Sequence, residues 1–150
     1  MKWITRERPK IDRIACPWLI KKFIDPEAEF LYVPKDEVIS ASQSQQAIPY
    51  DIAGVELTHE GDLCSFDAFI KKYDLKDEGL NQLALIIRAA DTDKVHLSAQ
   101  APGLLAITLG LSENITNDHE MLKVGMIIYD SLYTWCRKLS DQRHGWNPTP

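Results

Sequence analysis

Residues 12–26 read DRIACPWLIKKFIDP, and this segment contains the first helix expected in the chain. Pro17 has no backbone N–H, so it is best tolerated in a first turn, and we expect the helix to begin at about Ile14 to Pro17. Asp25 ends it, because the residue before a proline is disfavoured in the helical conformation. The apolar residues that recur at helical spacing are Trp18, Leu19, Ile20 and Phe23.

Short segments rich in β-forming residues lie around this helix. Residues 3–5 predict one strand, and residues 30–33 predict another. Because the run at 30–33 is apolar on both faces, we expect it to be a central strand. Residues 48–52 and 55–58 predict two further extended pieces around Gly54.

Helical patterns dominate the rest of the chain. Residues 35–47 are polar and indicate a short helix followed by a surface loop, and the polar, proline-rich tail after Arg143 is expected to be loose. Ser65 is a plausible N-cap, and Asn117 with Glu120 resembles a capping box. The later helices are expected at 66–72, 77–90 and 102–110, and from Asn117 along an apolar stripe to Leu139.

The helix at 102–110 is apolar on all sides, so we expect it to be buried. Strands come early and helices late, which predicts an α+β class. The expected fold is a helix-dominated single domain over residues 1–150, with a small sheet from the N-terminal strands and a long C-terminal helix.

Composition excludes several classes of protein. The 150 residues are 45% hydrophobic, which suffices for one core without disulfides. With 17 Lys and Arg against 22 Asp and Glu, the net charge is −5, so nucleic-acid binding is not expected of this chain alone. The N-terminus shows no signal peptide, and no apolar run reaches the ~18 residues of a membrane span. We expect a soluble, cytoplasmic protein without membrane contact.

The three cysteines are an odd number, which argues against a disulfide framework and indicates a reducing compartment. Cys136 falls on the apolar stripe of the last helix and is expected in the core. Cys16 precedes Pro17 at the expected helix start, where the helix dipole, with Arg13 nearby, would favour the thiolate. The alternative is that Cys16 is a small buried hydrophobic residue.

Cys64 also follows a strand and a loop and precedes a helix. With His59 and Asp67 close in sequence, it could ligate a metal ion, form a thiolate–imidazolium pair, or bind an anion at the helix N-terminus. In the structural alternative, Asp67 interacts favourably with the helix dipole and His59 lies at the strand end.

Two other polar groups lie beside helix ends. Asp91, Asp93 and His96 follow a helix C-terminus, where they could hold a cation or lie in a solvated loop. Asp12 and Arg13 precede the first helix, where charged residues usually act as caps.

No glycine-rich phosphate loop, nucleophile elbow or zinc-protease helix motif occurs in the sequence. If the two helix starts face each other, Cys16 and Cys64 converge with His59 and Arg13. Such a pocket would attract an oxyanion, could reduce it through its thiols, and would equally suit a soft or borderline metal ion.

The same residues carry a resemblance to a known family. The run RPKIDRIACPWLIKKFIDPEA at residues 8–28 is very similar to the opening of the bacterial chromate-resistance family, the ChrB-type C-terminal domain. The similarity covers essentially the whole chain through FLYVP at 30–34, PYDI at 49–52, GVEL at 54–57, the segment 59–67, AAD at 89–91 and PGLLAI at 102–107.

This resemblance implies a role in chromate resistance, as a regulator or sensor that works with a chromate efflux transporter. Longer members carry an N-terminal region associated with DNA binding, and others are fused to rhodanese-like domains. The implied partners are chromate or another small oxyanion, and a regulatory or sulfurtransferase domain. The matching motifs mark Asp12, Arg13, Cys16, Trp18, His59, Cys64, Ser65, Asp67 and Asp91.

Three hypotheses follow from the residues and the resemblance. In the first, Cys16, Cys64 and His59 are reactive groups of an oxyanion pocket, and His59 with Cys64 can also bind a transition-metal ion. The second is a sensing module without turnover. The third is a metalloenzyme that uses His59 with Asp91 or Asp93. The residues expected to bind the ligand are Asp12, Arg13, Trp18, Ser65, Asp67 and Asp91.

Overall fold

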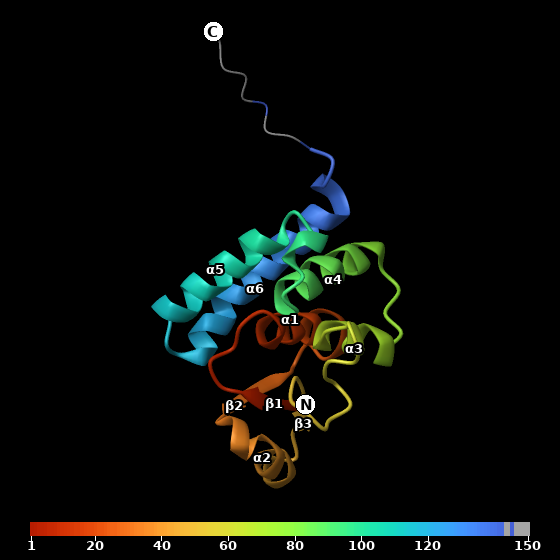
Figure 1. Cartoon of the computed structure of the whole chain (residues 1–150). Coiled ribbons are helices and arrows are strands. Elements are labelled where there is room, and N and C mark those ends of the chain that lie inside the picture. Colours follow the sequence, from red (N-terminus) through yellow and green to blue (C-terminus); the bar gives the residue numbers. More distant parts are fainter. Residues whose placement is uncertain (143–144, 146–150) are drawn as a thin grey trace.

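A three-stranded parallel sheet with the strand order β2-β1-β3 lies at one end of the fold in this computed structural model, which describes residues 1–142 and 145 (Figure 1). β1 (Lys2–Arg6) is central, between β2 (Glu29–Val33) and β3 (Ile48–Pro49). The prediction that residues 30–33 form a central strand is therefore wrong. Leu31 and Val33 stay partly exposed on this edge strand, while the β1 residues Trp3 and Ile4 are fully buried.

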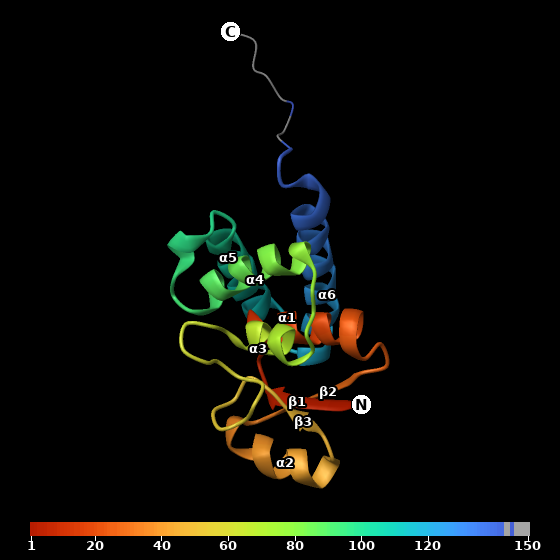
Figure 2. The same ribbon diagram turned by 90° about the vertical axis from the view of Figure 1, so that its right-hand side faces the viewer.

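Different helices cover the two faces of the sheet. Trp3 belongs to the main core with residues of α1 (Asp12–Leu19), whereas Ile4 points to the opposite face and packs with Val38 at the start of α2 (Val38–Gln45). α1 connects β1 to β2 and α2 connects β2 to β3, so these connections run over opposite faces (Figures 1 and 2). In open parallel sheets, such a reversal marks the edge where ligands bind, beyond the carboxyl ends of the strands.

Most of the helical part of the fold lies on the Trp3 side of the sheet (Figure 2). The remaining helices are α3 (Ser65–Lys72), α4 (Glu78–Asp91), α5 (Ala101–Asn114) and α6 (Asp118–Thr134). π-helical turns follow at Ile20–Ile24 and Trp135–Leu139, and 3-10 turns form at Lys35–Glu37 and Val95–Leu97. The helix-dominated α+β class is confirmed.

α1 begins at Asp12, before the expected start at Ile14 to Pro17, so Pro17 lies inside the helix. There it cannot donate a hydrogen bond to the carbonyl of Arg13. The hydroxyl of Tyr32 on β2 donates to that carbonyl at 3.5 Å. The sheet thus supplies a donor for the carbonyl that the proline leaves without one.

The expected strands at 48–52 and 55–58 are largely absent, since the chain pairs with β1 only over Ile48–Pro49. Pro49 removes a donor from the ladder, and Asp51 adopts a left-handed conformation with φ of 51°. Together these turn the chain away from the sheet and place residues 51–63 in a loop.

Two predictions about the helices are confirmed and two are wrong. Asn117 caps α6 by accepting a hydrogen bond from the backbone of Glu120 at 3.0 Å, and Cys136 is buried in the core. The N-cap of α3 is Cys64 and not Ser65. The expected burial of the helix at 102–110 is also wrong, because α5 packs with one face only.

That face of α5 carries the buried residues Ala101, Leu104, Thr108 and Ser112. Ile107 on the outer face is 54% exposed, and Leu109 is 46% exposed. None of the helices within the described residues is both long and apolar enough to cross a membrane. The tail after Arg143 lies outside the described residues, apart from Gly145.

Close contact between α1 and α6 at Gly125 fixes the position of α1, and this contact is testable. A Cβ atom at Gly125 would overlap the Cγ2 methyl of Ile14. We expect Gly125→Ala to lower the free energy of unfolding by about 1–3 kcal/mol in urea denaturation. The control is Gly110→Ala in α5, because an added Cβ there meets nothing within 4 Å. This substitution should raise the free energy of unfolding by about 0.5–1 kcal/mol. Unchanged stability of Gly125→Ala would contradict this packing.

Candidate functional site

Four polar side chains from four separate segments meet beyond the carboxyl ends of β1 and β3. The Nε2 atom of His59 lies 3.0 Å from Oδ2 of Asp91, 3.4 Å from Oδ2 of Asp12 and 3.4 Å from Oδ1 of Asp51. Asp12 begins α1, Asp51 follows β3, His59 lies in the loop before α3, and Asp91 ends α4. We call Asp12, Asp51, His59 and Asp91 the carboxylate–histidine cluster.

The starts of α1 and α3 hold this cluster together. Oδ2 of Asp12 accepts a hydrogen bond from the backbone N–H of Ser65 at 2.7 Å, and the Ser65 hydroxyl donates to Oδ1 of Asp51 at 2.7 Å. The backbone N–H of Asp12 donates to Oδ1 of Asp91 at 3.4 Å. The two helix starts therefore do face each other, and carboxylates at both satisfy N–H groups that have no partner within their helices.

The charges of the cluster are strongly coupled. Burial raises the pKa of Asp12, and burial together with the charges of Asp12 and Asp51 raises the pKa of Asp91 to about 8. Burial also opposes the ionisation of Asp51, but hydrogen bonds from His59 and Ser65 outweigh it and lower the pKa of Asp51. Hydrogen bonds to Asp12 and Asp51 raise the pKa of His59 to about 10.

Two arginines neutralise one carboxylate of the cluster. The Nε atom of Arg13 lies 3.3 Å from Oδ2 of Asp51, and Nη2 of Arg6 lies 3.4 Å from the same oxygen. Asp12 and Asp91 make no ion pair with a lysine or arginine in the described part of the chain, and their cationic partner there is His59. The positive charge is thus concentrated on the Asp51 side of the cluster.

Buried polar atoms without hydrogen-bond partners gather at the same edge of the sheet. Within residues 1–142, they include Oδ1 of Asp12, Nε of Arg6 and Oγ1 of Thr5. Thr5 and Arg6 end β1, and Asp12 begins the helix that follows it. A buried polar atom without a partner costs free energy, so this region has hydrogen-bonding capacity that the protein does not fill.

A cavity of about 460 Å³ opens beside the cluster. Arg6, Lys35, Asp51 and His59 are among the residues that line it. The first three lie at or just after the carboxyl ends of the three strands. The cavity is therefore located where a parallel sheet with this connection pattern binds its ligands.

The two cysteines lie beside the cluster, but their surroundings favour the thiol. Both side chains are fully buried and neither forms a disulfide. Burial and the charges of Asp12 and Asp51 raise the pKa of Cys16, which lies in the second turn of α1 and not in the first. Burial and the charges of Asp12 and Asp67 raise the pKa of Cys64. The thiolate-favouring environment expected from the sequence is not present.

Asp67 caps α3 and does not reach the cluster. One of its oxygens, Oδ2, accepts from the backbone N–H of Cys64 at 3.0 Å and from the Cys64 thiol at 3.3 Å. The guanidinium of Arg88 on α4 donates to both oxygens of Asp67, at 2.9 Å and 2.8 Å. This matches the structural alternative for Asp67 and adds Arg88, which the sequence patterns did not single out.

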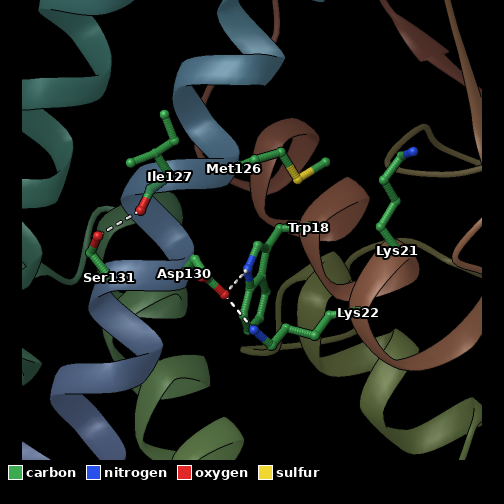
Figure 3. A pocket seen from close by; sticks show the side chains of 7 residues that line it. All are labelled: Trp18, Lys21, Lys22, Met126, Ile127, Asp130 and Ser131. Atoms are coloured by element: carbon green, nitrogen blue, oxygen red, sulfur yellow. Dashed lines mark hydrogen bonds and ion pairs between the residues drawn. The ribbon is translucent and has the colours of Figure 1, made fainter.

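Trp18 lies in a different place from the cluster. Its indole N–H donates to Asp130 of α6 at 3.4 Å, and Lys22 pairs with the same carboxylate in a shallow pocket between α1 and α6 (Figure 3). The structure therefore brings four residues of the predicted ligand-binding set, Asp12, Arg13, Ser65 and Asp91, together with the predicted reactive residue His59. It separates Trp18 and Asp67 from them.

Asp51, Arg6 and Lys35 are the residues of this region that the sequence patterns missed. Each lies at or just after the end of a parallel strand, which is the position where ligand-binding side chains collect in such sheets. The signal was present in the sequence, but using it required the strand directions. Asp93 lies outside the group of metal-binding geometry found in the described residues.

The burial and protonation of the Cys16 and Cys64 thiols can be tested directly. We expect Ellman's reagent to modify neither Cys16 nor Cys64 within minutes in the native protein at pH 8, because both thiols are buried and protonated. All three cysteines should react at once in denaturant. Rapid native labelling of Cys16 or Cys64, mapped by mass spectrometry, would contradict this description of the site.

Comparison with known proteins gives the chain its family. The family described as ChrB, C-terminal domain, matches residues 3–136. Protein ChrB of Cupriavidus metallidurans is 36% identical over 134 residues, which cover 89% of this chain and 40% of that protein. No solved structure matches the chain. Since the family match extends over nearly the whole fold, the chain belongs to the ChrB C-terminal domain family of chromate-resistance proteins.

Proposed function

We propose that the chain is a cytoplasmic sensing domain of chromate resistance that binds chromate, or a closely similar oxyanion, in the cavity beside Asp51. The observation that carries the proposal is that two cationic side chains, Arg6 and Lys35, line this one cavity. Both are cations at the carboxyl edge of a parallel sheet, where small ligands are usually bound.

Arg6 has unused capacity for an anion. Its Nη2 atom is 3.4 Å from Asp51, a long contact, and its buried Nε–H has no acceptor within the described residues. An oxyanion accepts charge-assisted hydrogen bonds from guanidinium and ammonium groups, and these are stronger than hydrogen bonds between neutral groups. Lys35 makes no ion pair with the described carboxylates, so its ammonium is available to the same ligand.

The thiols favour sensing over reduction. Thiol–disulfide chemistry and thiol reduction of an oxyanion both begin with attack by a thiolate. Because burial and nearby carboxylates raise the pKa of Cys16 and Cys64, neither is suited to this step. The chain aligns with 40% of its longer relative, and we propose that ligand binding is transmitted to a regulatory or sulfurtransferase partner domain.

Calorimetric titration with chromate tests the binding proposal. We expect Arg6→Gln and Lys35→Gln each to weaken chromate binding by about tenfold or more, because each removes a charged donor worth about 1.5–3 kcal/mol. Lys76→Gln is the control, since Lys76 pairs with Asp74 on the exposed surface and does not line the cavity. Sulfate serves as a competitor of the same shape. The proposal would be wrong if the protein showed no saturable chromate binding, or if all three variants bound chromate with equal affinity.

Turnover is tested separately from binding. We expect chromate to be consumed by dithiothreitol at the same rate with and without the protein, as followed by the chromate absorbance. The physical reason is that the buried, protonated thiols of Cys16 and Cys64 cannot start the reaction. A protein-dependent acceleration that disappears in the Cys16→Ala plus Cys64→Ala variant would instead establish a reductase.

A further inference from the structure

We propose that Asp12, His59 and Asp91 form a binding site for one divalent first-row transition-metal ion. The inference goes beyond the oxyanion proposal and stands on different residues from Arg6 and Lys35. Each of the three side chains offers one donor atom, and these atoms all lie within 4.8 Å of one another. Donors bound to a common ion at about 2.0–2.2 Å are separated by comparable distances, so only small adjustments would be needed.

The unfilled carboxylate oxygen of Asp12 is an independent indication of a ligand. Asp12 is only 1% exposed, and its Oδ1 atom has no hydrogen-bond partner within the described residues. The other oxygen, Oδ2, already accepts from Ser65 and lies beside His59. Burying a carboxylate is costly unless it is paired or coordinates a metal, so a buried carboxylate with one oxygen unfilled and the other beside His59 supports a bound cation here.

The surrounding charges identify which residues would bind the ion. Asp51 already interacts with Arg6, Arg13 and the hydroxyl of Ser65, so its oxygens are occupied. Asp12 and Asp91 have no lysine or arginine partner in the described part of the chain. Their cationic partner is His59, which must release its proton to ligate a metal, and a divalent cation between the three side chains would replace that positive charge.

The donor types narrow the class of metal. Two carboxylates with one imidazole suit Mn²⁺, Fe²⁺, Co²⁺ or Zn²⁺, whereas soft ions prefer thiolates. Cys64 is not among the three donors, since its thiol donates to Asp67 instead. His59 is 41% exposed and also lines the cavity, so an ion can enter from that side and keep coordination positions open to it.

Metal titration of the full chain tests this site directly. Protein treated with EDTA and then dialysed is titrated with MnCl₂, CoCl₂ and ZnCl₂ in a calorimeter, without chromate. We expect one bound ion per chain, and at least about tenfold weaker binding in His59→Ala and in Asp91→Asn. Asp93→Asn is the matched control, because it removes a nearby carboxylate outside the donor group.

Further measurements separate loss of the ion from loss of the fold. Circular dichroism should show that His59→Ala, a change at a partly exposed loop residue, keeps its helical content. The Co²⁺ spectrum should show nitrogen and oxygen ligands without thiolate charge transfer, and it should be unchanged in Cys64→Ala. No saturable binding of any of the three ions, or undiminished binding in the folded His59→Ala and Asp91→Asn proteins, would overturn the inference. Chromate binding that survives such a result would leave the oxyanion proposal standing, and metal binding without chromate binding would overturn only that proposal.

Discussion

The buried carboxylate of Asp12 is the interaction on which the rest of the site depends. Its Oδ2 atom accepts the N–H of Ser65 at the start of α3, and its own backbone N–H donates to Asp91 at the end of α4. It also lies 3.4 Å from His59 in the long loop. One acidic residue at the start of α1 therefore joins three helices and a loop, and it gives two helix N-termini the negative charge that their dipoles favour.

The sheet places this junction where ligands can reach it. Because α1 and α2 cover opposite faces, the segments that follow the adjacent strands β1 and β2 separate at the carboxyl edge and leave room between them. Arg6 ends β1 and Lys35 follows β2, while Asp51 follows β3 on the other side of β1. The cavity and the carboxylate–histidine cluster are thus consequences of strand order. The contact of Gly125 with Ile14 affects the cluster indirectly, because it sets the position of α1, the helix that carries Asp12.

Local patterns in the sequence predicted most of the elements and part of the site. The capping signal at Asn117 and the apolar stripe through Cys136 were read correctly, because both depend on neighbours within a few turns of helix. The strand at 30–33 was placed wrongly because hydrophobicity on both faces does not distinguish an edge strand that a helix partly covers. Asp51 was missed because its role depends on strand direction, which only the assembled sheet reveals.

The surroundings of the cysteines likewise depend on contacts that local patterns do not reveal. Cys16 and Cys64 do lie near helix starts, as the sequence indicates, and a helix dipole alone would favour their thiolates. The fold buries both thiols and places Asp12 near both, with Asp51 near Cys16 and Asp67 near Cys64, so that burial and these negative charges raise the pKa of each thiol against the effect of the helix dipole. Of these carboxylates, Asp12 is also a donor of the proposed metal site. The two proposed sites of this domain therefore use oxygen and nitrogen atoms and not sulfur, and Arg6 and Arg13 beside Asp51 place positive charge on the side of the cluster where we propose that an oxyanion binds.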